Sequence, residues 1–340
     1  MIIAVAVSGG MDSLLALALL REAGHEVLAL HAHFLPPDAR QLRLTEALAG
    51  LCRGLGVPFR TVDLSISFRS RVIDPFVAAY AAGLTPNPCA GCNRDLKFGL
   101  LFEEAARLGA DRIATGHYAR IDHEGGLFRG TDPAKDQSYF LTRTPLKALA
   151  RAVFPLAFWR KADVPAALAA RDLAPPLPME SQEVCFIPGD DYRTFLEAQD
   201  VDLPGGGPVR LSDGRAIGRH QGLWRHTIGQ RKGLGIAWSE PLYVLEKLAG
   251  ENALVVGPKS GLDAFGCSVR EVNVLVAPGE WPERVLVQTC YRQRPRPARA
   301  VLSGPDMTIA FESAVPRPCP GQVAAVFDES GRALAGGIIA

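Results

Sequence analysis

The sequence IIAVAVSGGMDS, at residues 2–13, decides the fold of the first half of this chain. Residues 2–7 are continuously apolar and rich in β-branched side chains, a pattern typical of a strand covered on both faces. Ser8-Gly9-Gly10 predicts a turn, and residues 13–23 are strong helix formers that stop at Gly24. A second apolar strand is expected at residues 26–33. These elements form a βαβ unit, which predicts a parallel sheet.

The same alternation of strands and helices continues to about residue 115. Helices are expected at residues 42–55, 72–82 and 95–108, and strands at residues 58–64 and 112–115. This order predicts an α/β fold, with an open, doubly wound parallel sheet in an N-terminal nucleotide-binding domain. Ligands of such folds bind outside the carboxyl ends of the strands.

The pattern changes after about residue 174, where three prolines fall within residues 175–178. From residue 209 onward, short β-type runs alternate with Gly and Pro turns. The clearest of these runs are residues 242–248, 253–256, 285–291 and 323–327. One or two small β-rich modules are therefore expected behind the α/β domain.

The composition bounds the class of protein. With 340 residues, 48% hydrophobic and 21% charged, the chain has enough apolar residues for two or three domains. Thirty-seven Lys and Arg against 36 Asp and Glu exclude a polycationic binder, so any nucleic-acid site must be locally charged. Seven cysteines, an odd number, favour reduced thiols over a disulfide scaffold. Neither a signal peptide nor a membrane-length apolar run is apparent, so we expect a cytoplasmic protein without membrane partners.

The turn after the first strand has the features of an anion site. Two glycines allow close backbone approach, and the N–H groups at the start of the following helix can hold phosphate. Ser8 and Ser13 add hydroxyl donors, while Asp12 would either face Mg²⁺ or hold the turn. No Lys follows as in a P-loop, and the G-x-G-x-x-G pattern is absent. The alternative is a tight turn with Ser capping.

Three thiols stand out from the remaining cysteines. Cys89 and Cys92 form a C-x-x-C before a helix beginning near Asn93, and the helix start and Arg94 are expected to lower their pKa. Cys185 lies in a VCFI run that otherwise predicts a buried strand. The alternatives are a redox pair, packing, or a zinc half-site, which lacks a second C-x-x-C or H-x-x-x-H. The cysteines expected only to pack are Cys52, Cys267, Cys290 and Cys319.

Two segments carry local positive charge. Residues 203–239 hold six Lys or Arg and one acid, with His and Trp interleaved. Residues 284–304 hold five Arg and no acid, with Tyr291 among them. Cations that contact phosphates and aromatics that stack on bases are typical of RNA binding. The alternative is a solvated basic face.

These motifs together resemble a known family. The SGGxDS loop resembles the pyrophosphatase loop of synthetases that cleave ATP between the α and β phosphates and adenylate an oxygen of the substrate. Further strings, in the family's order, resemble the tRNA-specific 2-thiouridylases. They are TPNP (85–88), LKF (96–98), ATGHY (114–118), KDQSYFL (135–141), VCFI (184–187), HQG (220–222), GQRKGLGI (229–236), YRQ (291–293) and PGQ (320–322).

The resemblance implies an architecture and an activity. It implies an ATP pyrophosphatase-loop α/β catalytic domain at residues 1–175, a small central domain at 185–250 and an RNA-contacting C-terminal β-barrel at 256–340. The implied reaction is ATP-dependent 2-thiolation of the wobble uridine, position 34, in the anticodon arm of tRNA. ATP is cleaved to AMP and diphosphate with Mg²⁺. The sulfur donor is either the persulfide of a carrier protein or free sulfide.

The resemblance also assigns residues. Cys92 takes the place of the nucleophile and Cys185 that of the persulfide carrier, and these two thiols would form a disulfide as the S–S bond is resolved. The residues implied for ATP are Ala6, Val7, Ser8, Gly9, Gly10, Met11, Asp12, Ser13, Ala32 and Gly116. Those implied for the RNA are Asn87, Pro88, Cys89, His117, Lys135, Asp136, Gln137, Cys290, Tyr291 and Gln322.

The chain departs from the family's pattern at three positions. Cys89 replaces the Asp that usually follows TPNP, which puts an acid/base role there in doubt. Cys89, Cys92 and Cys185 are therefore candidates to hold three irons of a [4Fe–4S] cluster, with sulfide on the fourth. Ala32 replaces a Met that contacts the nucleotide, and Cys290 replaces an Arg. The alternatives are another adenylating synthetase, a non-enzymatic RNA-binding or sulfur-carrier protein, and a paralogue that thiolates a different acceptor.

Overall fold

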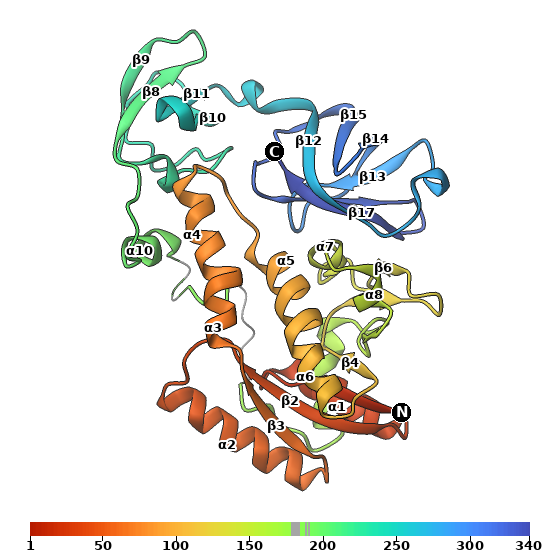
Figure 1. The fold of residues 1–340 in the computed structure, drawn as a ribbon. Coiled ribbons are helices and arrows are strands. Elements are labelled where there is room, and N and C mark those ends of the chain that lie inside the picture. The colour runs from red at the N-terminus through yellow and green to blue at the C-terminus, as the bar shows by residue number, and fades with distance from the viewer. Residues whose placement is uncertain (178–183, 188, 190) are drawn as a thin grey trace.

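The computed structural model describes residues 1–177, 184–187, 189 and 191–340. Its elements form an α/β unit, a small four-stranded sheet and a closed barrel (Figure 1). Within the described residues, no helix has the length and apolar character needed to cross a membrane.

The α/β unit is built on a five-stranded parallel sheet, as predicted. Its strand order is β3-β2-β1-β4-β7, and every neighbouring pair is parallel. The pairing of β1 with β2 ends at Ala6 and Leu30, so the chain leaves β1 just before Ser8. The strands are β1 (Ile2–Ala6), β2 (Glu26–His33), β3 (Phe59–Asp63), β4 (Arg112–Ala114) and β7 (Ala152–Val153).

Helices cover both faces of this sheet, which confirms the doubly wound fold. One core joins Ile3 and Val27 to Leu17 and Leu48, which belong to α1 (Met11–Glu22) and α2 (Ala39–Gly54). The alternate strand residues belong to a second core with the helices of residues 65–107. Those helices are α3 (Ser65–Phe68), π-helical η1 (Arg69–Ile73), α4 (Asp74–Ala81), α5 (Pro88–Cys92), π-helical η2 (Asn93–Leu100) and α6 (Leu101–Arg107).

The helix that carries Cys89 and Cys92 begins earlier than expected. The apolar pattern predicts a start near residue 95, but α5, η2 and α6 follow one another without a break from Pro88. The Asn87 side chain accepts a hydrogen bond from the Ala90 N–H, and Pro occupies the first helical position. Both cysteines therefore lie in the first helical turns, and the π-helical segment η2 follows directly, a feature frequent at functional sites.

The segment between the sheet and the small domain is mostly short helices. Residues 184–187 form a turn, with Ile187 N bonded to Val184 O at 3.0 Å, so the expected strand is wrong there. Phe186 packs instead against Phe68 and Phe76. The elements of this part are β5 (Ala119–Ile121), β6 (Leu127–Arg129), α7 (Ser138–Leu141), α8 (Leu146–Leu149), η3 (Lys161–Asp163), α9 (Val164–Ala169) and α10 (Tyr192–Glu197).

The β-rich second half forms two separate sheets. The small sheet has the order β10-β11-β8-β9, with β8 (Gly207–Leu211), β9 (Ala216–His220), β10 (Tyr243–Leu248) and β11 (Ala253–Gly257). Short 3₁₀ helices lie between the strands of this sheet and of the barrel. They are η5 (Leu223–Arg225), η6 (Ala249–Glu251), η7 (Lys259–Leu262) and η8 (Pro278–Glu280). The barrel consists of β12 (Asp263–Val274), β13 (Val285–Gln288), β14 (Arg296–Ser303), β15 (Asp306–Pro316), β16 (Val323–Phe327) and β17 (Ala333–Ile339).

Candidate active site

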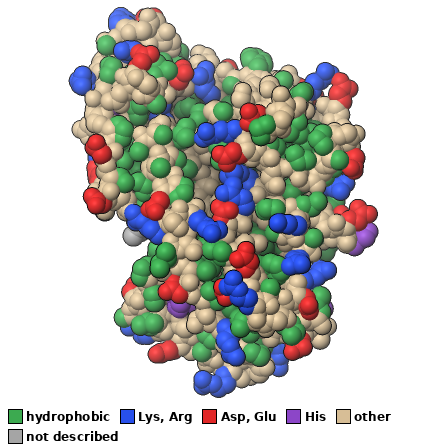
Figure 2. Space-filling view, in the orientation of Figure 1, with side chains coloured by type: hydrophobic (Ala, Val, Ile, Leu, Met, Phe, Trp, Pro, Cys, Tyr) green, Lys and Arg blue, Asp and Glu red, His purple; other side chains and the backbone are tan. Residues whose placement is uncertain are grey.

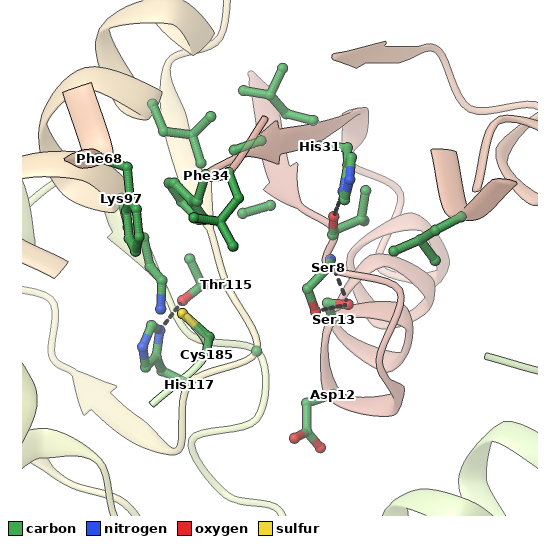
Figure 3. Close-up of a pocket in the computed structure, with 18 of the residues that line it drawn as sticks. Ser8, Asp12, Ser13, His31, Phe34, Phe68, Lys97, Thr115, His117 and Cys185 are labelled. Atoms are coloured by element: carbon green, nitrogen blue, oxygen red, sulfur yellow. Dashed lines mark hydrogen bonds between the residues drawn. The ribbon is translucent and has the colours of Figure 1, made fainter. Parts of the chain in front are cut away.

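A cavity of about 410 Å³ lies at the carboxyl ends of β1, β2 and β4. Segments far apart in the sequence form its walls (Figure 3). Ten of the residues predicted for ATP, RNA or sulfur line it: Ala6, Val7, Ser8, Asp12, Ser13, Ala32, Gly116, His117, Gln137 and Cys185. The sheet edge expected to bind a ligand is thus the one with the cavity.

The turn after β1 is folded around its two serines. Ser13 Oγ accepts from Ser8 N at 3.1 Å, lies 3.2 Å from Ser8 Oγ, and donates to Gly10 O at 3.0 Å. Gly9 has φ +90°, and an added Cβ there would lie 2.7 Å from the Leu44 side chain. Helix α1 begins at Met11 without a side-chain cap. Its first N–H groups are therefore left for an anion in the cavity.

Asp12 holds the turn in this structure. Its carboxylate accepts from Lys161 Nζ at 2.7 and 2.6 Å and from the Tyr118 hydroxyl at 2.7 Å. A carboxylate paired in this way is already neutralised by a cation, so its geometry does not fit a Mg²⁺ ligand without exchange of Lys161. Of the two sequence alternatives for Asp12, the structure shows the one that stabilises the turn.

The loop after β4 closely approaches the turn after β1, residues 8–13, which is the candidate anion site and is named the anion turn. An added Cβ on Gly116 would lie 2.8 Å from the Asp12 carbonyl carbon and 2.9 Å from Ser13 N, so only glycine fits there. The neighbouring His117 is buried, with Nδ1 2.7 Å from Thr115 Oγ1. Burial holds the pKa of His117 well below its ordinary value, and Lys97 lowers it further. His117 is therefore neutral at physiological pH.

The thiols have raised, not lowered, pKa values, so the sequence expectation is wrong. Burial raises the pKa of Cys92 to about 12 and also raises the pKa of Cys89 and Cys185. Arg94, expected to help, is bonded to the neighbouring Asp95 at 2.7 and 2.8 Å. The helix N-terminus does not offset the loss of hydration, because charge is costly in a buried site. Lys97 is the cation that favours the thiolates.

Cys185 and Lys97 face the anion turn across the cavity. Figure 3 shows the Cys185 sulfur and the Lys97 amine beside Thr115 and His117, with Ser8, Asp12 and Ser13 on the opposite side. Cys185 is accessible through the cavity although protein surrounds most of the residue. The arrangement puts a sulfur atom and the anion turn at one cavity.

The three thiols are neighbours but do not form a metal site. Cys89 and Cys185 each raise the pKa of Cys92, which places them within electrostatic range. All seven cysteines are free thiols. In the described part of the chain, no group of three or more His, Cys, Asp or Glu side chains is gathered to hold a metal ion. Thiolate is a suitable ligand for iron, so the donor type of the three residues suits a cluster, although their sulfurs are not gathered as a metal site in this structure.

The barrel holds the loop that precedes the cysteine helix. Gln322 Nε2 donates to Thr85 O at 2.9 Å and to Pro86 O at 3.2 Å. Thr85 N donates in turn to Pro320 O at 2.9 Å. Gln322, predicted to contact RNA, therefore connects the barrel to the TPNP loop, and Asn87, also predicted at the RNA, caps α5.

The other predicted RNA residues are divided between interior and surface. Asp136 is buried and accepts from Gly130 N and Ser138 N at 3.0 Å each. Gln137 Oε1 accepts from Tyr118 N at 3.1 Å. Exposed Cys290, the neighbouring Tyr291 and partly buried Lys135 lie nearer the surface, and Tyr291 lines a second cavity of about 390 Å³ together with Asp136. Lys135 and Tyr291 are thus more accessible to RNA than Asp136.

Much of the local basic charge is neutralised. Arg210, Arg225 and Arg284 pair with carboxylates outside their own segments, Glu251, Glu197 and Glu312. Among described residues, the cations of the two segments without an ion pair are Arg219, Arg231, Lys232, Arg292, Arg294 and Arg296. Figure 2 shows Lys and Arg side chains along the middle of one face, between the barrel and the small sheet above and the α/β unit below.

Sequence reasoning missed three residues of the site. Lys97 was part of a quoted string, yet nothing in the string indicated that its amine faces Cys185. Lys161 has no motif around it that predicts its pairing with Asp12. His31 precedes Ala32 without a motif that singles it out, although it lines the cavity.

The chain matches two family models. Residues 1–189 match the tRNA methyl transferase HUP domain, and residues 194–258 match the tRNA methyl transferase PRC-barrel domain. A solved structure, the U34-tRNA thiolase NcsA from Methanococcus maripaludis with its [4Fe-4S] cluster, is 17% identical over 59% of this chain and 73% of its own, with a TM-score of 0.36. A likeness this distant supports no conclusion about this chain.

Relatives match over the whole length. The tRNA-specific 2-thiouridylase MnmA of Oleidesulfovibrio alaskensis is 56% identical, and the alignment covers 99% of both chains. Its counterpart in Nitratidesulfovibrio vulgaris strain Miyazaki F is 53% identical over 99% of this chain and 98% of that protein. The protein of the same name in Roseiflexus castenholzii is 40% identical over 99% of both. Because these identities extend from end to end, the chain belongs to the tRNA-specific 2-thiouridylase family.

Proposed function

We propose that this protein is an ATP-dependent tRNA uridine 2-sulfurtransferase that acts on the wobble uridine, position 34. The observation that carries the proposal is the single cavity with the anion turn on one side and Cys185 on the other. Adenylation takes place at the C2 oxygen and sulfur delivery at C2 of the same carbonyl group, so the two steps need one shared cavity. The names of the full-length relatives support the same activity.

The first step activates the uracil. The N–H groups at the start of α1, with Ser8 and Ser13, would hold the phosphates of ATP. The uracil C2 oxygen attacks the α-phosphorus, the bond to the β-phosphate breaks, and diphosphate leaves. This converts C2–O into a linkage whose leaving group is AMP. Mg²⁺ bound with ATP would neutralise phosphate charge.

The second step delivers sulfur. The terminal sulfur of a Cys185 persulfide attacks C2, and AMP leaves with the oxygen. Cys92 then attacks the Cys185 sulfur, the S–S electron pair passes to the uracil sulfur, and a Cys92–Cys185 disulfide forms. An external dithiol must reduce that disulfide before another turnover. Lys97, which lines the cavity with Cys185 and favours the thiolates, would assist the attack.

The two-thiol route is preferred over a cluster. Among the described residues Cys89, Cys92 and Cys185 are not gathered as a metal site, and no step is assigned to [4Fe–4S]. The sulfur donor is then a carrier-protein persulfide, and free sulfide is the competing donor. Cys89 cannot supply the carboxylate chemistry of the usual Asp, and its raised pKa keeps the thiol protonated at neutral pH, so it offers no free base.

We infer that the anticodon arm lies against the barrel and the small sheet. The unpaired cations of residues 203–239 and 284–304 support this placement. The proposed domains are 1–175 for catalysis, 185–250 as the central domain and 256–340 for RNA contact. Lys135 and Tyr291 would contact the RNA at their junction.

The test is anaerobic. Purified protein, ATP, Mg²⁺ and unmodified tRNA are incubated with free sulfide or with a persulfide donor, and 2-thiouridine is measured by nucleoside mass spectrometry. Product only with the persulfide supports the two-thiol route, and product from sulfide alone favours a cluster. Cys92→Ser and Cys185→Ser should each abolish product, whereas Cys267→Ser, in the barrel, should not.

Two outcomes would overturn the proposal. Thiolation that survives both Cys92→Ser and Cys185→Ser removes the sulfur chemistry assigned here. ATP–diphosphate exchange that depends on a small acid and is indifferent to tRNA would identify another adenylating synthetase of the same superfamily.

A further inference from the structure

His31 lies at the carboxyl end of β2 with one ring nitrogen committed. Its Nδ1 is 2.7 Å from Val7 O. A carbonyl oxygen can only accept, so Nδ1 carries the hydrogen and donates it. In a neutral ring, Nε2 then has the lone pair and is an acceptor.

The ring is held in this neutral form. His31 is 7% exposed, and burial is the largest cause of its lowered pKa, exceeding the opposite effect of the bond to Val7. His33 stands perpendicular to it at 5.0 Å and lowers the His31 pKa further. The acceptor at Nε2 therefore persists across the physiological pH range.

The second ring nitrogen of His31, Nε2, has no hydrogen-bond partner among the described residues. His31 lines the cavity, and no described residue bonds its Nε2. By contrast, His33 Nδ1 is sealed in the interior without a partner. An acceptor that faces the cavity can exchange a hydrogen bond to water for one to a ligand, so a ligand that donates to His31 Nε2 gains affinity.

The surroundings indicate which part of a nucleotide reaches it. Val7, to which the ring is bonded, directly precedes Ser8 of the anion turn. The cavity also has an apolar lining that includes Leu30, Phe34 and Leu44, which suits a purine and its sugar. A nucleoside placed beside bound phosphates offers two kinds of donor, a ribose hydroxyl and the exocyclic amine of adenine.

We propose that His31 Nε2 accepts a hydrogen bond from the nucleoside of ATP and selects nucleotides that have a donor at that position. The inference rests on the proposed use of ATP and adds the residue that reads the nucleoside. Ala32, which replaces the family's usual Met, lies next to His31 and keeps the cavity open at this point.

The test is a binding cycle on the full chain. Dissociation constants are measured by calorimetry for ATP, 2′-deoxy-ATP, 3′-deoxy-ATP and ITP, which lacks the amine. Wild type should lose about fivefold in affinity for the one analogue that lacks the donor. His31→Phe should bind ATP about fivefold more weakly than wild type does. Its affinity for the analogue that lacks the donor should equal that of wild type.

The controls separate this inference from folding and from the proposed function. His33→Phe, which alters the sealed neighbour, should retain the preferences of wild type. His31→Gln, whose amide has both a donor and an acceptor, should recover part of the discrimination, and thermal melts should show that each variant is folded. Unchanged ATP affinity in His31→Phe, or losses that multiply for every analogue, would overturn the inference. A wild type that binds no ATP refutes the proposed function, whereas absent thiolation with an intact binding cycle leaves the inference standing.

Discussion

The reactivity of Cys92 gives the most direct test of the site's electrostatics. Burial raises the pKa of this thiol from 9.0 to about 12. Three pKa units reduce the thiolate fraction about 1,000-fold at pH 7.5. Because a more basic thiolate is also more nucleophilic, by roughly 20-fold over three units, the net alkylation rate should fall about 50-fold. Limited access to a side chain that is 8% exposed slows it further.

The measurement is iodoacetamide labelling of the substrate-free protein, followed at Cys92 by peptide mass spectrometry. The matched reference is the same cysteine in the urea-unfolded chain, where it titrates as an ordinary thiol. Between pH 7 and 10 the folded rate should rise about tenfold per pH unit without a plateau, which steric protection alone would not cause. Lys97→Met should slow Cys92 further, because Lys97 lowers its pKa.

A plateau below pH 9, with a rate within fivefold of the unfolded chain, would refute the reasoning. It would show that the start of α5 stabilises the Cys92 thiolate more than burial destabilises it. The original sequence expectation would then be right.

Three further outcomes are expected. Gln322→Ala removes the donor to Thr85 and Pro86, so amide exchange in the TPNP loop should accelerate and thiolation should fall several-fold, by about 1–2 kcal/mol. Desolvation lowers the pKa of the partly buried Lys247 to about 8, so wild-type stability should rise as pH increases from 8 to 10.5. Lys247→Met should flatten this rise, by about 2 kcal/mol in urea titrations. Gly116→Ala should abolish ATP binding in calorimetry while far-ultraviolet circular dichroism is retained, because its Cβ would collide with the anion turn.

The parallel sheet was predictable because its signals are local. The apolar runs of β1 and β2 fix two buried strands, and β2 was predicted with both bounds as observed. The start of α5 was missed because it depends on Asn87 and Pro88, which interrupt the apolar period. The run at residues 184–187 predicted a strand because its side chains are apolar, but Phe186 uses that character to pack on α3 and α4.

The site was predictable as a set of residues but not as an electrostatic environment. Motif spacing brought Ser8, Gly116 and Cys185 to the correct cavity. The direction of the thiol pKa shifts depends on how much protein surrounds each sulfur, which the positions of Cys89 and Cys92 at a helix start do not disclose. The sequence Lys135-Asp136-Gln137 likewise does not disclose that Asp136 is buried and accepts hydrogen bonds from backbone N–H groups.

Both the anion turn and the turn that carries Cys185 are held by contacts to neighbouring segments. Leu177 N donates to Gly9 O at 2.9 Å, so the chain that follows α9 is bonded to the anion turn. On the other side of Cys185, Phe186 packs against Phe68 and Phe76, at 5.6 and 5.2 Å between ring centroids. Adenylation at the C2 oxygen and sulfur delivery to C2 act on one carbonyl group, and the anion turn and Cys185 line the one cavity that this requires.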